Sequence, residues 1–340
     1  MSSTFAIEAH DLRKRYGDSV ALAGIDLSVA TGSVCGLLGP NGAGKTTAVR
    51  ILTTLSRPNG GTARVAGFDV LESPREVRRR IGLAAQDATV DGLLSGLENL
   101  TMIGELHHLG RAIARRRGEE LLEQFALAEA GRKLAKEYSG GMRRRLDLAA
   151  TLVAGPEVLF LDEPTTGLDP RGRNELWAVL DTLVDEGTTV LLTTQYLEEA
   201  ERLADEIVVV DHGRVIARGD ARHLKRQVGG DQLLIVPVNP DDLVPVAAIV
   251  ERVVGVRATI DRPTRRVMAP AAAGAAAIAS VATELVTAGI DVEDLGLHQP
   301  TLDDVFMTLT GTPAATDGNA SGASAVPGAS AAPAAEEVLQ

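Results

Sequence analysis

Residues Gly39 to Thr46 fit the pattern G-x-x-x-x-G-K-[ST] of a phosphate-binding loop. They directly follow an apolar run, Val34–Leu38, which predicts a buried strand, and an apolar helix is expected after them. Glycines let the backbone turn back, so main-chain N–H groups at the start of the helix can surround a phosphate. In such a loop Lys45 places its charge on the β- and γ-phosphates of a nucleotide, and the Thr46 hydroxyl binds Mg²⁺. The residues predicted to bind the nucleotide here are Gly39, Pro40, Asn41, Gly42, Ala43, Gly44, Lys45, Thr46 and Thr47.

Two acidic residues, Asp162 and Glu163, directly follow a second apolar run, Val158–Leu161. If this strand ends beside the phosphate loop, the Asp162 carboxylate lies near the same Mg²⁺ ion. Glu163 is then placed to polarise a water molecule that attacks the terminal phosphate. The alternative is that both acids only cap the turn before Pro164.

Further motifs occur in the order typical of the ATP-binding-cassette (ABC) ATPases, and the chain resembles this family from residue 1 to about residue 219. After the phosphate loop these motifs are Gln86, Tyr138–Met142, Leu161–Pro164 and Gly167–Asp169. Within the family, the chain resembles the ATP-binding subunits of daunorubicin/doxorubicin-resistance-type drug exporters. That narrower resemblance rests on the Tyr-Ser-Gly-Gly-Met signature, Arg143–Arg145, Thr193–Tyr196 and Gln299–Phe306.

The resemblance implies roles for residues outside the phosphate loop. Tyr16 matches the aromatic residue that stacks on adenine, and a tyrosine ring gains by covering the face of a base. Gln86 matches the glutamine that reaches Mg²⁺ and the attacking water. The alternatives are a half-buried core tyrosine and a surface glutamine. The metal ligands implied are Thr46, Gln86 and Asp162, and the catalytic residues implied are Glu163, Gln195 and Lys45.

Ser139, Gly140 and Gly141 match the signature whose helix start faces the γ-phosphate held by the opposite subunit, and Asp169 matches the D-loop aspartate. Small residues at the start of a helix leave N–H groups free for an anion. The same residues would also make an ordinary helix cap. One phosphate loop and one signature per chain imply a homodimer with two shared sites.

Gln195 departs from the family pattern, which usually has histidine at this position. Glutamine donates a hydrogen bond but cannot carry a proton or a charge. Losing one oriented donor costs on the order of 10²-fold in rate, so slow hydrolysis is one expectation.

The elements that must position these residues alternate between strand and helix, which predicts an α/β fold. Together with the resemblance, the expected fold is a P-loop NTPase of ABC type. It has a parallel core sheet flanked by helices, an antiparallel N-terminal subdomain and a helical subdomain, followed by a small α+β C-terminal domain. The expected boundaries are 1–228 for the nucleotide-binding domain, with the helical subdomain at about 87–155, then 229–311 for the small domain and 312–340 for a disordered Ala/Pro/Gly/Ser tail.

The composition of the chain limits the classes of partner and the compartment that we expect. The 340 residues carry a net charge of −12, which argues against nucleic acid as a partner. Cys35 is the single cysteine, which fits a reducing compartment. No signal peptide is expected, and the alanine-rich run from 269 to 290 is interpreted as a helix outside the membrane. The arginine runs at 78–80, 115–117 and 143–145 are expected to be solvated helix faces.

The resulting prediction is an ATPase subunit, with ATP and Mg²⁺, at the cytoplasmic face of the cell membrane. It would power a separate transmembrane permease that exports a drug-like amphipathic molecule. One alternative is a soluble ABC ATPase with no role in transport. Another is an ATP-dependent dimerisation module with slow turnover.

Overall fold

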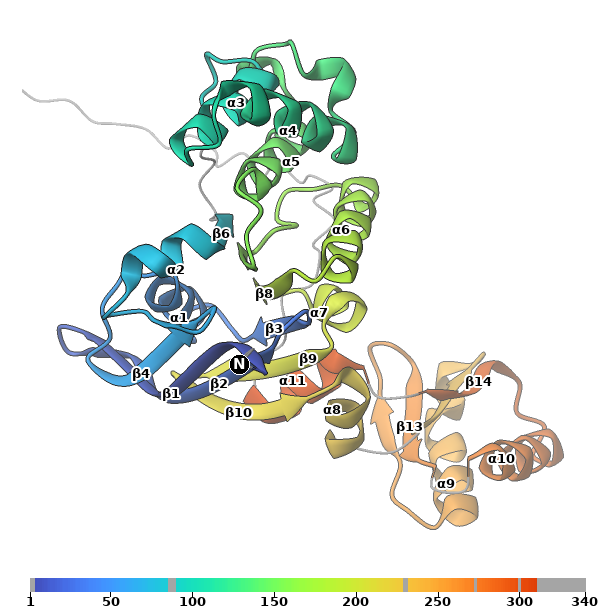
Figure 1. Cartoon of the computed structure of the whole chain (residues 1–340). Coiled ribbons are helices and arrows are strands. Elements are labelled where there is room, and N and C mark those ends of the chain that lie inside the picture. The colour runs from blue at the N-terminus through green and yellow to red at the C-terminus, as the bar shows by residue number, and fades with distance from the viewer. Residues whose placement is uncertain (1–3, 85–89, 229–231, 272–273, 299–300, 311–340) are drawn as a thin grey trace, which may run out of the picture.

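The computed structural model describes residues 4–84, 90–228, 232–271, 274–298 and 301–310 (Figure 1). Gln86, Gln299 and the tail at 312–340 lie outside these ranges, so the structure does not test the predictions made for them. Within the described ranges, none of the helices combines the length and the hydropathy needed to cross a bilayer.

A six-stranded sheet forms the centre of the nucleotide-binding part, in the order β10-β9-β3-β8-β7-β6. All neighbours are parallel except β10, which pairs with β9 in the antiparallel sense. Every residue of the three adjacent strands β3, β8 and β7 is buried, which explains why apolar residues dominate their sequences. The strands are β3 (Val34–Leu38), β6 (Ile81–Ala84), β7 (Val158–Asp162), β8 (Thr189–Thr194), β9 (Glu206–Asp211) and β10 (Arg214–Gly219).

Both faces of this sheet are covered. On one face Val158 and Phe160 of β7 pack with the antiparallel sheet and helix α1. On the other face Leu159 and Leu161 pack with α5 and α6. The helices of this part outside the helical subdomain are α1 (Lys45–Leu52), α2 (Pro74–Arg80), α6 (Pro170–Asp185), α7 (Leu197–Leu203) and α8 (Ala221–Val228).

The N-terminal residues form the predicted antiparallel sheet, in the order β2-β1-β4-β5. Its buried side chains include Ile7, Leu12 and Ile25, which pack with Ile51 and Leu52 of α1. The strands are β1 (Phe5–Tyr16), β2 (Ser19–Ala30), β4 (Gly60–Val65) and β5 (Phe68–Asp69).

A helical subdomain stands between β6 and β7, at the top of Figure 1. Its first helix starts with a capping box, in which the Ser95 hydroxyl accepts from the Glu98 N–H and the Glu98 carboxylate accepts from the Ser95 N–H. Its elements are α3 (Gly96–Leu106), α4 (Arg111–Gln124), the 3₁₀ turns η1 (Ala128–Ala130) and η2 (Ala135–Glu137), and α5 (Gly140–Leu152).

The C-terminal part contains a four-stranded antiparallel sheet, β12-β13-β11-β14, with α9 and α10 packed on it. The sequence interpretation found α10 but missed α9 and β14, because α9 is apolar around much of its circumference and β14 lacks clean alternation. The elements are β11 (Gln232–Pro237), η3 (Pro240–Asp242), α9 (Leu243–Val254), β12 (Thr259–Asp261), β13 (Arg266–Pro270), α10 (Ala275–Thr287) and β14 (Val292–His298).

The last described helix, α11 (Leu302–Thr310), returns to the nucleotide-binding part. Its Leu302, Val305 and Phe306 are buried with Leu197 of α7 and Leu224 of α8. The expected boundaries put these residues in the small domain, because α11 directly follows that domain in sequence. The apolar side chains of α11 instead complete a cluster beside β9, and the small domain has a separate core.

Candidate active site

The phosphate loop turns sharply between the end of β3 and the start of α1, and its glycines are required by close backbone contacts. A Cβ atom on Gly39 would lie 2.2 Å from the Val210 carbonyl oxygen. Gly44 has a φ of 110° and would bring a Cβ to 2.5 Å from the Ala21 carbonyl oxygen. Helix geometry leaves the first N–H groups of α1 without intrahelical acceptors, so they are available to an anion at this end.

Lys45 lies in this loop with only 6% of its surface exposed. Its Nζ donates to the carbonyl oxygens of Gly39 at 2.7 Å and Pro40 at 3.2 Å. Burial lowers the pKa of Lys45, while the nearby carboxylates of Glu163 and Asp162 act in the opposite direction. The ammonium is therefore a desolvated positive charge held over the loop.

Asp162 lies beside the loop, as the sequence pattern predicted. The Thr46 hydroxyl lies 3.5 Å from Asp162 Oδ1, although 116 positions separate the two residues. The same carboxylate oxygen accepts a hydrogen bond from the Thr193 hydroxyl, and Asp162 is 5% exposed. Thr46 and Asp162 thus present two hard oxygen donors to one point next to Lys45.

Glu163 turns away from β7 in a left-handed conformation with a φ of 50°. A residue with a Cβ is strained there, and such strain persists only where the surroundings hold it. The Glu163 N–H donates to the Thr193 carbonyl at 3.0 Å, and Thr166 Oγ1 lies 3.5 Å from Glu163 Oε2. Asp162 contacts Thr46 and Thr193, so its carboxylate does more than cap the turn before Pro164.

Gln195 follows the end of β8, which lies between β3 and β7 in the sheet. The Thr194 hydroxyl accepts from the Tyr196 N–H at 2.9 Å and so tightens the turn that carries Gln195. Since parallel strands end at the same edge, the structure brings Gln195 to the edge that carries the phosphate loop and both acids.

Tyr16 lies at the end of β1 and is 50% exposed, so it is not a core tyrosine. The Lys14 ammonium lies 4.9 Å from the centre of its ring. The ring is available to a planar group.

The signature forms the start of α5, with Ser139 as the residue that precedes the helix. Ser139 Oγ accepts from the Met142 N–H at 3.2 Å, so Ser139 does cap the helix, and a Cβ on Gly140 would meet open space. Asp169 caps α6 by accepting from the Gly172 N–H at 2.9 Å. Together Ser139, Gly141 and Asp169 line a cavity of about 490 Å³, and its lining includes none of the fully described residues 39–46.

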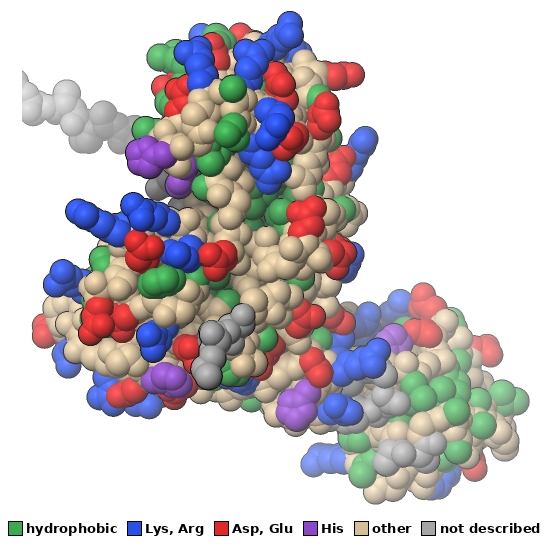
Figure 2. Space-filling model, viewed as in Figure 1, with side chains coloured by type: hydrophobic (Ala, Val, Ile, Leu, Met, Phe, Trp, Pro, Cys, Tyr) green, Lys and Arg blue, Asp and Glu red, His purple; other side chains and the backbone are tan. Residues whose placement is uncertain are grey.

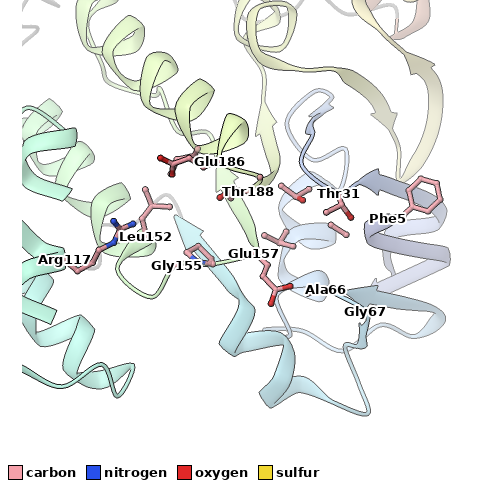
Figure 3. A pocket seen from close by; sticks show the side chains of 16 residues that line it. Phe5, Thr31, Ala66, Gly67, Arg117, Leu152, Gly155, Glu157, Glu186 and Thr188 are labelled. Atoms are coloured by element: carbon pink, nitrogen blue, oxygen red, sulfur yellow. The ribbon is translucent and has the colours of Figure 1, made fainter. Parts of the chain in front are cut away.

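A different cavity, of about 640 Å³, opens at the opposite edge of the sheet (Figure 3). It is lined by Glu157 and Thr188, which precede β7 and β8, together with Thr31 and Arg117. None of the predicted site residues that the structure describes lines it, so the candidate site lies at the other ends of the strands.

The three arginine runs differ in how far their side chains are exposed. The basic side chains of α2 and α4 stand on the surface (Figure 2), where Arg79 pairs with Glu76 and Arg115 pairs with Glu119. On α5 the prediction of a solvated face holds for the exposed Arg143 but was wrong for Arg144 and Arg145, whose side chains are only 12% and 18% exposed. The sequence gives no sign of this difference, since the buried pair and the exposed runs are equally rich in arginine.

Glu199 of α7 was not singled out in the sequence, yet its surface is only 1% exposed. Burial raises the pKa of Glu199 to about 7, while interactions with Thr194, Thr165 and Trp177 act to lower it. Thr194 directly precedes Gln195, and Thr165 lies two residues after Glu163. This carboxyl group therefore lies between the turn after β8 and the turn after β7.

Comparisons with known proteins agree with the function that this geometry suggests. The family described as "ABC transporter" matches residues 22–166. The "Daunorubicin resistance ATP-binding protein DrrA2" of Streptomyces coeruleorubidus is 55% identical over 307 residues, which cover 90% of this chain and 95% of the relative. The "Daunorubicin/doxorubicin resistance ATP-binding protein DrrA" of Streptomyces peucetius is 48% identical over 92% of this chain and 94% of its own length.

The chain belongs to the ABC transporter family of ATP-binding proteins. Among solved structures, cbiO1 of Clostridium perfringens, part of the ABC transporter complex cbiONQ, is 26% identical with a TM-score of 0.60, covering 66% of this chain and 95% of that one. The predicted fold class is confirmed, and the chain is a nucleotide-binding ATPase whose hydrolysis is coupled to transport.

The substitution Glu199→Gln tests whether burial raises the pKa of the Glu199 carboxyl group. The folded pKa of about 7 lies above the ordinary value of 4.5, so the folded state keeps a proton that the unfolded state has lost, and stability falls as pH rises between these values. We expect Glu199→Gln to match the wild type near pH 4.5 and to exceed it at pH 8 by about 1–3 kcal/mol in thermal unfolding. The exposed neighbour Glu198 provides the control Glu198→Gln, and an equal loss at both pH values for Glu199→Gln would contradict the account.

Proposed function

We propose that this chain is the ATP-hydrolysing subunit of an exporter that moves a drug-like amphipathic small molecule through a separate transmembrane permease. The observation that carries the ATPase role is the meeting of Thr46 and Asp162 at 3.5 Å beside the buried Lys45. The transported class is supported by the drug-resistance relatives, which match the chain over 90% or more of its length.

The reaction is an in-line attack of water on the γ-phosphate. Main-chain N–H groups of the loop and Lys45 bind the phosphate oxygens and spread their charge. Glu163 orients the water and takes its proton, and the bond from the γ-phosphorus to the leaving oxygen of ADP breaks as the new P–O bond forms. Gln195 donates a hydrogen bond at the γ-phosphate and keeps Glu163 and the water in line.

The residues fit Mg²⁺, because Thr46 and Asp162 supply the oxygen ligands that this ion prefers. When bound, the ion would neutralise charge on the β- and γ-phosphates. The family pattern adds Gln86 as a ligand. Tyr16 is proposed to stack on adenine, since its exposed ring can cover the base.

The signature residues Ser139, Gly140 and Gly141 and the D-loop residue Asp169 are proposed to act on a partner copy. The cavity that Ser139, Gly141 and Asp169 line has none of residues 39–46 of the same chain in its lining, which supports a shared site. In a face-to-face homodimer each loop meets the signature of the other copy. ATP binds the closed dimer better than the open one, so binding closes the dimer and hydrolysis releases it.

The permease partner places this chain peripherally at the cytoplasmic face of the membrane. If a neighbouring reading frame encodes a hydrophobic membrane protein, co-expression with that protein tests this placement. We expect the chain in the membrane fraction, and drug efflux from the cells, only when both proteins are present. Equal drug efflux without the membrane protein, or with Lys45→Ala, would exclude the export function.

Glu163→Gln tests the assignment of the water-orienting carboxylate. The amide cannot take a proton, so we expect kcat to fall by roughly 10²-fold or more while ATP affinity is kept. The variant should then accumulate as an ATP-bound dimer on gel filtration. Glu198→Gln, with an exposed side chain, is the matched control. Normal hydrolysis by Glu163→Gln would show that another group does this work.

Gln195→His distinguishes a working ATPase from an ATP-dependent dimerisation module with slow turnover. The glutamine favours slow turnover, because it cannot carry a charge or a proton. We expect unchanged ATP affinity and a rise in kcat of up to about 10²-fold, because histidine is an oriented donor that also carries charge. Steady-state hydrolysis and equilibrium binding measure the two effects separately. A loss of ATP affinity would contradict the placement of Gln195 at the γ-phosphate, because histidine can donate the same hydrogen bond there.

A further inference from the structure

Arg144 connects the signature helix to the turn that carries the catalytic acids. It lies on α5, five residues after Ser139, and its side chain reaches across to the segment after β7. Its Nη2 donates to the carbonyl oxygens of Asp162 at 3.2 Å and Glu163 at 3.1 Å. Its Nε donates to the carbonyl of Pro164 at 3.1 Å. One guanidinium group therefore holds three consecutive carbonyl groups.

This contact is buried and charged. The Arg144 side chain is 12% exposed, and Asp147 on the next turn lies 3.8 Å away with its side chain 1% exposed. Burial lowers the pKa of Arg144, and the nearby acids Asp147 and Asp162 oppose that change. The planar, forked guanidinium suits several carbonyl acceptors at once, whereas a lysine ammonium is a single point charge.

The segment that Arg144 holds is the strained one. Glu163 has a φ of 50°, a conformation that lasts only where neighbouring groups fix it on more than one side. On one side its N–H binds the Thr193 carbonyl, and on the other Arg144 binds its carbonyl oxygen. The direction of the Glu163 carboxylate therefore depends on where α5 places Arg144.

We propose that Arg144 is a positioning residue that links the two sites of the dimer. An anion captured at the signature Ser139–Gly141 fixes the start of α5, and Arg144 passes that position to Glu163 of the same chain. The nucleotide of one site thereby sets the water-orienting carboxylate of the other. This inference rests on the proposed function, because it requires the signature to face the partner's nucleotide.

Arg144→Gln and Arg144→Lys in the full-length chain, with its permease, test the positioning role. We expect kcat to fall at least about 10-fold for the glutamine variant and less for lysine, with ATP affinity unchanged within about 2-fold. Arg116→Gln is the matched control, because Arg116 is an arginine of the same subdomain whose side chain is 74% exposed. An unchanged kcat, or a loss of affinity equal to the loss of kcat, would overturn the proposal.

Mixed dimers decide which site Arg144 serves. One copy carries Glu163→Gln, so only the other copy hydrolyses ATP, and two affinity tags isolate dimers with one of each. Arg144→Gln added to the Glu163→Gln copy should leave turnover within about 2-fold, whereas on the hydrolysing copy it should lower turnover at least about 10-fold. The reverse pattern would mean that Arg144 supports only the signature, and the proposal would fail.

Glu163→Gln alone separates this failure from failure of the proposed function. If that variant forms no ATP-dependent dimer, the shared-site function is wrong and the Arg144 link falls with it. If the dimer forms and the mixed dimers show the reverse pattern, only the Arg144 link is wrong.

Discussion

The site depends on the parallel alignment of three buried strands. β8 pairs with β3 on one side and with β7 on the other, in a register that sets Asp162 opposite Thr193 and Leu38 opposite Thr194. Because all three strands end at one edge, the phosphate loop, the two acids and Gln195 emerge together there. The interiors of the strands are apolar, and a shift in register would separate the groups that their ends bring together.

Around that edge the charges balance each other at close range. Lys45 is desolvated and lies near two carboxylates, while Arg144 donates hydrogen bonds to the carbonyl groups of the turn that carries those acids. Glu199 lies beneath the same loops as a buried carboxyl group with a pKa of about 7. A nucleotide with several negative charges therefore enters a site whose cations are buried and fixed, which is the arrangement that strengthens electrostatic binding.

The sequence predicted the parts of the site that are local in the chain. The loop Gly39–Thr46, Asp162 at a strand end and the cap at Asp169 each follow from a few adjacent residues. Arg144 and Glu199 were missed because their burial depends on segments about 20 positions or more away, or on a neighbouring helix. The pairing of the signature with a second copy cannot be read from spacing in one chain and rests on the family. α11 was placed with the wrong neighbours because its partners, α7 and α8, lie about 75–105 positions earlier.

The central claim is that main-chain N–H groups and Lys45 hold a triphosphate beside Thr46 and Asp162. Calorimetric titration of the purified full-length chain with ATP and magnesium tests it most directly, with Lys45→Ala as the comparison. The account predicts binding by the wild type and an affinity lowered at least about 10-fold by Lys45→Ala, as expected for loss of one buried charge-assisted contact. The absence of binding to the wild type, or equal affinity in the two proteins, would contradict it.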